Sequence, residues 1–307
     1  MIDRFGRPLT SLRISVTDEC NLNCFYCHRE GCPASQLLMS PQEIGQIAEL
    51  AAKLGMKRIK LTGGEPLMRK DIVEIVAEIA KAPVEEISLT TNGTLLSQYA
   101  KELARAGLKR VNISLDTLKP EKFLRITGSD MLDEVLRGVE SAVNAGLNPV
   151  KLNMVVLSGI NDDEIEDMIS FASKHGAILQ LIELLLPEGD KGLSCYYRDL
   201  AEIERNMQSR AIAFENRKLM HARKKYILPE GAVEIVRPMH NTEFCMHCTR
   251  LRVTADGRLK PCLMRNDNLV DLLPHIRASD TLAAQKDFLN AISKREPFFK
   301  GERKPRA

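Results

Sequence analysis

Six of the eight cysteines in this chain fall into two short triplets, one near each end of the sequence. The triplets are Cys20, Cys24 and Cys27, and then Cys245, Cys248 and Cys262. Three thiolates in one short loop can hold three irons of a [4Fe–4S] cluster and leave the fourth iron open to another ligand. Each triplet therefore predicts a cluster site with one open position.

Zinc and covalently attached haem are the alternatives to an iron–sulfur cluster at the first triplet. Zinc usually takes four ligands, and the nearby candidate for a fourth is His28, which is awkwardly adjacent to Cys27. The segment from Cys24 to His28 also matches the C-x-x-C-H haem attachment pattern. Haem of that type is attached outside the cytoplasm, and Cys20 would be unexplained. An iron–sulfur cluster is favoured over both.

The second triplet leaves structural zinc open, with His240 or His247 as the candidate fourth ligand. The other two cysteines, Cys32 and Cys195, lie outside the triplets. Both are expected to be partly buried bystander thiols, because free cysteine is often simply buried.

Composition limits the class of protein. A chain of 307 residues can bury one large core or two smaller ones, and its 44% hydrophobic content is ordinary for a globular protein. The net charge of +3 is too small to indicate a nucleic-acid surface. No apolar run is long enough to cross a membrane, and residues 1–10 lack the apolar core of a signal peptide. A cytoplasmic protein is expected, in which cysteines are metal ligands rather than disulfides.

The elements that position these residues are marked by helix ends. Glycine just past a helix favours the left-handed conformation that ends it, and this pattern predicts helix-to-strand junctions at Gly55, Gly107, Gly146 and Gly176. Residues 40–43 predict a capping box, and residues 161–164 repeat its spacing. Strands are expected at residues 12–16, 59–62, 87–91, 111–116, 150–155 and 178–183.

Alternating strands and helices predict an α/β fold with a parallel sheet. Six such units suit an incomplete (β/α)6 TIM-like barrel over residues 1–186. Residues 187–307 are expected to form a C-terminal α+β region that carries the second cluster and part of the substrate site. In it, residues 187–232 are expected to contain basic helices, with residues 223–225 on a solvated face, followed by a hairpin at residues 255–257 and a closing helix over 280–294.

Polar and apolar residues alternate along the expected strands, although strands buried on both faces would be apolar throughout. Because helices must cover the outer face, the polar set is expected to line the inside. That set includes Arg13, Lys60 and Lys151, which favours a cavity for an anionic ligand. An open sheet with one solvated face is the alternative.

The first triplet follows the first strand, and Gly63-Gly64-Glu65-Pro66 follows the second. This combination resembles the radical S-adenosylmethionine (SAM) superfamily. The resemblance implies that the open iron chelates SAM, which is then split to a 5′-deoxyadenosyl radical. The SAM contacts that it implies are Tyr26, Gly64, Ser114 and Leu185.

The segments 13–18, 61–67, 159–162, 248–254 and 256–263 resemble the GTP 3′,8-cyclase family, which begins molybdenum cofactor biosynthesis. The resemblance implies cyclisation of GTP to (8S)-3′,8-cyclo-7,8-dihydroguanosine 5′-triphosphate, with 5′-deoxyadenosine and methionine as co-products and no side chain as catalytic acid or base. It implies two [4Fe–4S] clusters, the second binding guanine through its open iron. The GTP contacts that it implies are Arg13, Lys60, Thr91, Lys151, Arg250, Leu251 and Arg252.

The same resemblance implies an unidentified cellular one-electron donor and a downstream cyclic pyranopterin monophosphate synthase that receives the product; a homodimer stays open. The chain departs from the family pattern at several positions. Lys60 and Gln180 stand where arginine is usual, and Leu185 replaces a common methionine. Thr91 has the wrong parity to line the interior unless the strand end twists. The sequence ends in residues 304–307 without the family's terminal glycine pair.

Two rival functions are kept. A peptide-modifying radical SAM maturase would be expected to have more C-terminal cysteines and fewer converging cations. A ferredoxin-like electron carrier would close each cluster with four cysteines, whereas this chain offers three in each group.

Overall fold

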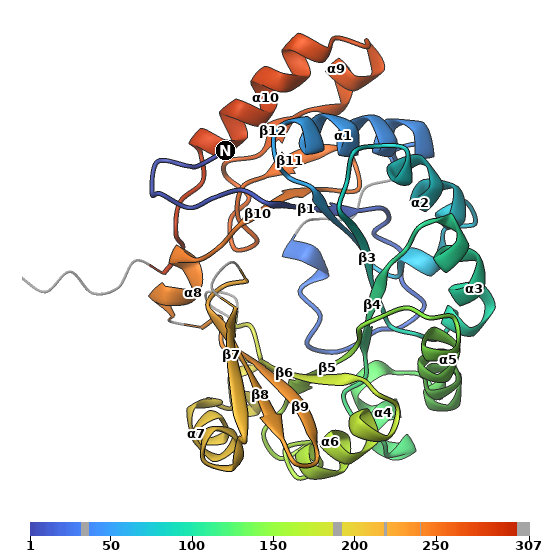
Figure 1. The fold of residues 1–307 in the computed structure, drawn as a ribbon, viewed down its shortest axis with the longest axis vertical. Coiled ribbons are helices and arrows are strands. Elements are labelled where there is room, and N and C mark those ends of the chain that lie inside the picture. Colours follow the sequence, from blue (N-terminus) through green and yellow to red (C-terminus); the bar gives the residue numbers. More distant parts are fainter. Residues whose placement is uncertain (32–36, 187–191, 218–219, 240, 300–307) are drawn as a thin grey trace, which may run out of the picture.

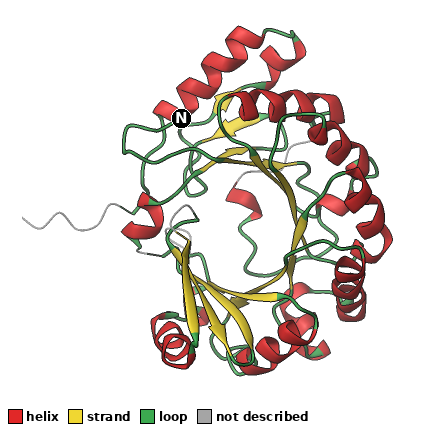
Figure 2. Ribbon diagram, viewed as in Figure 1, coloured by secondary structure: helices red, strands yellow, loops and turns green. Residues whose placement is uncertain are grey.

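The computed structural model describes residues 1–31, 37–186, 192–217, 220–239 and 241–299. Six parallel strands follow one another in chain order through the middle of the sheet. They are β1 (Ser11–Ser15), β2 (Arg58–Thr62), β3 (Glu86–Thr91), β4 (Arg110–Ser114), β5 (Val150–Val156) and β6 (Ile178–Glu183). The sheet curves around a central space with helices outside it, as Figures 1 and 2 show.

Helices connect the six strands and cover the outer face of the sheet (Figure 1). They are α1 (Pro41–Lys53), α2 (Ile72–Ala80), α3 (Leu96–Ala106), α4 (Pro120–Thr127), α5 (Leu132–Asn144) and α6 (Ile165–Lys174). The short 3-10 turns η1 (Arg29–Gly31) and η2 (Pro66–Met68) follow β1 and β2. This arrangement confirms the predicted incomplete barrel.

The C-terminal residues extend the same sheet on both sides. Beyond β6 lie β9 (Gly231–Val236), β8 (Arg223–Leu228) and β7 (Ala213–Arg217), and β9 is parallel to β6. Beyond β1 lie β10 (Arg250–Val253), β11 (Arg258–Lys260) and β12 (Val270–Asp271), and β10 is parallel to β1. The sheet is open, with β12 and β7 at its edges. The remaining described helices are η3 (Ser194–Tyr196), α7 (Ala201–Arg210), α8 (Thr242–Met246), α9 (Leu273–Arg277) and α10 (Thr281–Ser293).

The hydrophobic core lies between the sheet and the outer helices. Leu12 and Ile14 of β1 are fully buried there together with Ile44 and Ile47 of α1. The polar residues that alternate with these apolar ones face the other way and line an interior cavity. Alternation along the strands therefore separates core from cavity, as the sequence predicts.

Several local predictions are confirmed. Ser40 and Glu43 form the capping box of α1, because each side chain accepts a hydrogen bond from the other residue's backbone N–H. The hairpin between β10 and β11 and the closing helix α10 are present. The four junction glycines have positive φ angles: Gly55, Gly107, Gly146 and Gly176.

Two local predictions are wrong. Residues 223–225 begin β8 rather than a solvated helix, and the Arg223 side chain is buried. Their period-two alternation allows antiparallel pairing with β9, which the basic composition concealed. The segment 161–164 is not a capping box, because α6 begins at Ile165 and no side chain caps it. The Asn161 side chain instead donates hydrogen bonds to the backbone carbonyls of Asp116 and Val155.

No helix in the described ranges is long and apolar enough to cross a membrane. The predictions for Cys32, His240, the boundary at residue 187 and residues 304–307 lie outside the described residues.

Candidate active site

A cavity of about 440 Å³ occupies the inside of the partial barrel. Its size is typical of small-molecule sites. Residues from all six barrel strands line it, together with residues of β8, β9 and β10. Both cysteine triplets line this same cavity, and all six of these thiols are free. Groups from the two ends of the sequence therefore face one chamber.

The first triplet lies in the loop after β1. The backbone N–H of Cys27 donates to the carbonyl of Cys24 at 3.1 Å. Two further N–H groups point at sulfur, from Leu22 to Cys20 Sγ at 3.5 Å and from Arg29 to Cys27 Sγ at 3.4 Å. These N–H groups favour a thiolate and oppose the effect of burial, which raises the pKa of Cys20 and brings that of Cys24 to about 12. Three thiols in one short loop with N–H groups aimed at sulfur suit the ligands of a metal cluster.

The glycine turn after β2 packs backbone to backbone against that loop. The N–H of Gly64 donates to the Thr17 carbonyl at 2.8 Å. A Cβ at Gly64 would lie 2.1 Å from the Glu19 carbonyl oxygen, and one at Gly63 would lie 2.2 Å from the Thr17 oxygen. Only glycine fits at either position. The turn thus brings bare backbone to the cavity wall beside the first triplet.

Glu65 fastens the turn to the end of β3. Its carboxylate accepts hydrogen bonds from the Thr91 hydroxyl at 2.7 Å and from the Asn92 N–H at 2.6 Å. Burial raises the pKa of Glu65 to about 7, although these donors oppose the rise. Thr91 lines the cavity despite its parity, but its hydroxyl is already used by Glu65.

The donor set fits an iron–sulfur cluster at the first triplet. It offers three free thiols, N–H groups aimed at sulfur and a close glycine turn. Within the described ranges, no three His, Cys, Asp or Glu side chains are arranged to hold a single metal ion. A four-iron cluster is wider than one ion and needs sulfur atoms farther apart.

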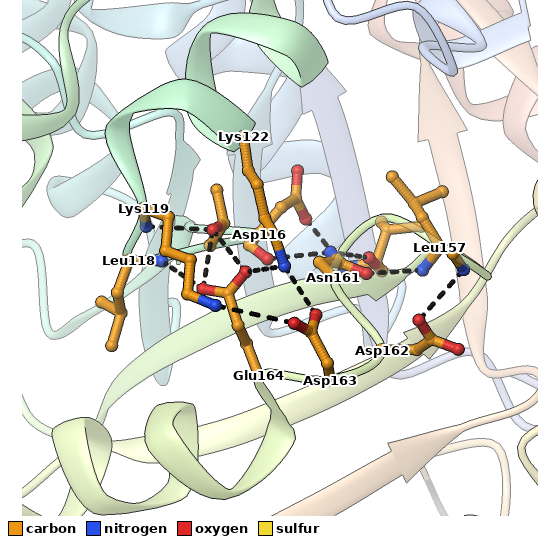
Figure 3. Close-up of polar contacts among 12 residues, drawn as sticks. Asp116, Leu118, Lys119, Lys122, Leu157, Asn161, Asp162, Asp163 and Glu164 are labelled. Carbon is orange, nitrogen blue, oxygen red and sulfur yellow. Dashed lines mark hydrogen bonds and ion pairs between the residues drawn. The ribbon is translucent and has the colours of Figure 1, made fainter.

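Tyr26 lines the cavity and is fixed there by a hydrogen bond to Asp116. The phenol donates to Asp116 Oδ2 at 2.5 Å, and Asp116 Oδ1 accepts from the Val155 N–H at 2.8 Å. The Asn161 amide then donates to the carbonyls of Asp116 and Val155 at 2.8 and 2.9 Å (Figure 3). Burial raises the pKa of Asp116 to about 6.

The same loops are cross-linked by Glu164. Its carboxylate accepts from the Thr117 hydroxyl at 2.8 Å and from the Leu118 N–H at 3.1 Å, and it pairs with Lys122 at 2.8 Å (Figure 3). Because Glu164 immediately precedes α6, the loops after β4 and β5 are held as one unit. This unit gives Asp116 a fixed position.

A row of cations crosses the sheet in register. Arg13 of β1 is paired with Arg252 of β10 on one side and with Lys60 of β2 on the other. Through Ser88 of β3 the row continues to Arg110 of β4. Neighbouring strands are about 4.8 Å apart, so these like charges are close together. All four cations line the cavity.

The cations of this row are buried and close together, which favours the binding of an anion. Burial lowers the pKa of Lys60 well below its usual range, and Arg110 and Arg13 lower it further. Burial also lowers the pKa of Arg250, with Arg223 as the next cause. No carboxylate of the described chain forms an ion pair with Arg250. A ligand with several negative charges would relieve this repulsion.

Arg110 is paired with Glu86 at 2.8 Å, and two further carboxylates neutralise part of the remaining charge around the cavity. Glu30 of η1 lies 2.8 Å from Arg252 and 3.7 Å from Arg13. Burial alone would raise the pKa of Glu30, but these two arginines bring it to about 2.

The second carboxylate is Glu234 of β9. It pairs with Lys151, with Arg217 at 2.6 Å and with Arg223 at 3.8 Å, and Gln180 donates to it at 2.7 Å. Against the effect of burial, Lys151 and Arg223 lower the pKa of Glu234 to about 2. Lys151 and Gln180 are therefore parts of one buried network in which a single carboxylate faces three cations, and burial lowers the pKa of Lys151 to about 7.

The second triplet is also surrounded by cations. Cys245 lies in α8, Cys248 just before β10 and Cys262 just after β11. Burial raises the pKa of the Cys248 thiol, but the nearby guanidiniums of Arg295 and Arg250 lower it to a net value below its usual range. This environment favours a thiolate, the form that ligates metals, at Cys248, whereas burial raises the pKa of Cys245.

The predicted binding residues mostly meet in the cavity. Those that line it are Tyr26, Gly64, Ser114, Leu185, Arg13, Lys60, Thr91, Lys151, Arg250 and Arg252. Leu251 differs, because its side chain is fully buried in the hydrophobic core and only its backbone can face a ligand. Cys195 is exposed, so the prediction that it is partly buried is wrong.

Sequence reasoning missed Arg110, Arg223, Glu234 and Glu30. Arg110 has the same strand parity as Asn112 and Ser114, and starting that strand one residue earlier would have included it. Arg223 and Glu234 lie on β8 and β9, and alternation along these strands would have been the signal for them. Glu30 sits in a short turn, and no periodic signal marks it.

Comparisons with known proteins agree on one family. A family model described as "Radical SAM superfamily" matches residues 14–172, and one described as "Molybdenum Cofactor Synthesis C" matches residues 178–300. A probable GTP 3′,8-cyclase of Methanothermobacter marburgensis is 52% identical, over 97% of this chain and 98% of its own length. One of Pyrococcus abyssi is 52% identical, over 97% of this chain and 99% of its own.

Solved structures show the same fold at low identity. Streptococcus suis SuiB bound to S-adenosylmethionine has a TM-score of 0.65 and 18% identity, over 87% of this chain and 64% of that chain. Native anSMEcpe with bound AdoMet has a TM-score of 0.64 and 19% identity, over 91% and 82% of the two chains.

Proposed function

Because the chain belongs to the GTP 3′,8-cyclase family of the radical SAM superfamily, we propose that it converts GTP into (8S)-3′,8-cyclo-7,8-dihydroguanosine 5′-triphosphate for molybdenum cofactor synthesis. One observation carries this proposal beyond the family name. Two three-cysteine sites and an in-register row of cations line one cavity. A radical source, a base anchor and a triphosphate site are the three parts that this reaction needs.

The first site would hold an iron–sulfur cluster on Cys20, Cys24 and Cys27. When bound, the cluster and SAM supply a 5′-deoxyadenosyl radical that takes the hydrogen atom from C3′ of GTP. Tyr26, held by Asp116, would orient the adenine of SAM, and the bare backbone at Gly64 would admit its methionine end. Ser114 and Leu185 line the same cavity and complete the proposed SAM contacts.

The cationic row would bind the triphosphate. Arg13, Lys60 and Arg252 stand side by side, and guanidinium groups suit phosphate oxygens by charge and fork geometry. Arg250, which lacks an ion-pair partner in the described chain, adds a further charge. Thr91, Lys151 and the backbone at Leu251 complete the proposed GTP contacts. Bound phosphate would replace Glu30 as the counterion of Arg13 and Arg252.

We place a second [4Fe–4S] cluster on Cys245, Cys248 and Cys262, with guanine bound at its open iron. The three free thiols in the shared cavity support this assignment. No side chain acts as acid or base in the proposed chemistry. The substrate loses one hydrogen atom to deoxyadenosine and regains one electron and one proton, so the product is an isomer of GTP.

The proposal also covers the partners of the reaction, the division of the chain and the departure at Lys60. The reducing electrons would come from a cellular one-electron donor, and the product would pass to cyclic pyranopterin monophosphate synthase. We assign residues 1–186 to the SAM barrel and residues 187–307 to the auxiliary-cluster region. Lys60 in place of arginine keeps the charge but loses the bidentate fork, so phosphate would be held there at one point.

An anaerobic incubation of the iron-loaded protein with SAM, a reductant and GTP tests the function. Chromatography coupled to mass spectrometry should find 5′-deoxyadenosine and a new compound with the mass of GTP but a different retention time. Deoxyadenosine formed equally with and without GTP, and with no new isomer, would overturn the proposal.

A further inference from the structure

Three buried charged residues lie against the backbone of the second cysteine triplet, and two of them donate hydrogen bonds to it. We call Asp3, Arg7 and Arg295 the charged clamp. Arg7 Nη1 donates to the carbonyl of Cys245 at 3.0 Å, and Arg295 Nη2 donates to the carbonyl of Cys248 at 2.6 Å. Two of the three proposed ligands of the auxiliary cluster are thus fixed by guanidinium groups.

Asp3 joins the two arginines. Its Oδ2 accepts from Arg7 Nε at 2.8 Å and from Arg295 Nη1 at 2.8 Å. Its Oδ1 accepts from the backbone N–H groups of Phe5 and Arg7, both at 3.0 Å. The carboxylate of Asp3 therefore stabilises the N-terminal turn and fixes the positions of both guanidinium groups. Arg295 follows α10, which runs beside the N-terminus in Figure 1.

The clamp is buried and carries excess positive charge. Arg7 is 4% exposed and Arg295 is 1% exposed, and a single carboxylate stands between two guanidiniums. Arg7 Nη2 and Arg295 Nε have no hydrogen-bond partner in the described structure. Arg7 also lines the cavity that the three thiols face. Unpaired donors on buried guanidinium groups and an excess of positive charge favour an anionic partner at this site.

We propose that Asp3, Arg7 and Arg295 position the auxiliary cluster. They hold the carbonyls of Cys245 and Cys248 so that the thiolates face the cavity, and they offset the negative charge of a thiolate-ligated cluster. This inference rests on the proposed second cluster. A buried ion triad adds little net stability in itself, because desolvation offsets most of its attraction.

The test isolates the second site. In a full-length protein with Cys20, Cys24 and Cys27 replaced by alanine, the proposed auxiliary site is left to take up cluster iron. Into this background go Arg7→Met, which removes the charge and the carbonyl contact, and Arg7→Lys, which keeps the charge. The control is Arg4→Met, because Arg4 belongs to the same turn but pairs with Glu296 at the surface.

Two measurements follow anaerobic reconstitution, namely iron per chain and the rate of iron loss to a chelator. Arg7→Met should lose iron at least tenfold faster than the parent protein, Arg4→Met should match the parent, and Arg7→Lys should fall between them. The same variants in a background without Cys245, Cys248 and Cys262 should hold the first cluster as firmly as their parent.

Three outcomes would overturn the inference. Arg7→Met could hold auxiliary iron as firmly as Arg4→Met, or it could loosen the first cluster by the same factor, which would mark a general loss of folding. A parent protein that takes up no iron at the second triplet would remove the proposed auxiliary cluster and the inference together. The first two outcomes leave the proposed function standing.

Discussion

Arg13 of β1 and Arg252 of β10 are register partners on adjacent parallel strands, although they come from opposite ends of the sequence. The carboxylate of Glu30 lies between them, 3.7 Å from Arg13 and 2.8 Å from Arg252. The C-terminal region thus supplies part of the cationic wall, and the loop after the first triplet supplies its counterion. An anionic substrate at this wall must compete with Glu30.

Replacing Arg252 by alanine should weaken GTP binding roughly 10- to 100-fold, because a hydrogen bond to a charged group contributes about 1.5–3 kcal/mol. Iron content should not change, since Arg252 contacts neither triplet. Titration calorimetry with the iron-loaded protein measures the affinity. The matched control is Arg258→Ala on the same hairpin, which removes an ion pair to Asp256 away from the cavity. Unaltered GTP affinity in Arg252→Ala means the pocket is assigned to the wrong residues.

Replacing Glu30 by glutamine should have the opposite effect. The amide no longer neutralises Arg13 and Arg252, so GTP displaces no ionic partner and should bind about 3- to 10-fold more tightly. The gain should shrink as salt screens the phosphates. Weaker binding in this variant would mean that Glu30 helps to hold the substrate rather than competing with it.

Asp116 should make stability depend on pH in a defined window. Its pKa of about 6 lies above the unfolded value near 3.8, so the folded state holds this proton more tightly. Stability from this group is therefore full below about pH 4, falls as the pH rises to about 6 and is constant above. Denaturant unfolding of Asp116→Asn should lack this fall. Parallel curves for the two proteins between pH 4 and 6 would contradict the assignment.

Tyr26→Phe tests whether the Asp116 contact serves SAM. The ring remains but the phenol that donates to Asp116 is lost, so SAM should bind several-fold more weakly while GTP affinity stays the same. Combining it with Asp116→Ala should add little, because both changes remove the same hydrogen bond. Additive losses of SAM affinity would show that the two residues act separately.

The two triplets should fail differently when their cysteines are replaced by alanine. Without Cys20, Cys24 and Cys27 no deoxyadenosine should form with any reductant. Without Cys245, Cys248 and Cys262 SAM should still be cleaved slowly, but no cyclised nucleotide should appear. Iron should fall from about eight to about four per chain in either variant. Zinc at the second triplet, or GTP cyclisation without it, would contradict the proposal.

Much of the fold and site could be predicted because the signals are local. The capping box at Ser40 lies within one turn of chain, and strand parity alone placed Arg13, Lys60 and Lys151 inside. The rest depends on long-range pairing. That β10 lies beside β1 follows from packing that no local pattern encodes.

The same limit explains the charges that were missed. Arg223 belongs to a basic run that is typical of a solvated surface, yet it is buried, where it donates to the Met220 carbonyl and lies 3.8 Å from Glu234 of the neighbouring strand. Asp3 and Arg295 form an ion pair across almost the whole length of the chain. Such partners cannot be chosen from composition or spacing.

The transfer of the hydrogen atom from C3′ of GTP to the deoxyadenosyl radical can be followed directly with an isotope. GTP deuterated at C3′ is incubated anaerobically with SAM, a reductant and the iron-loaded protein, and both products are analysed by mass spectrometry. 5′-Deoxyadenosine should gain one deuterium and the cyclised isomer should lose it, in equal amounts. Unlabelled deoxyadenosine together with unchanged GTP would contradict this transfer.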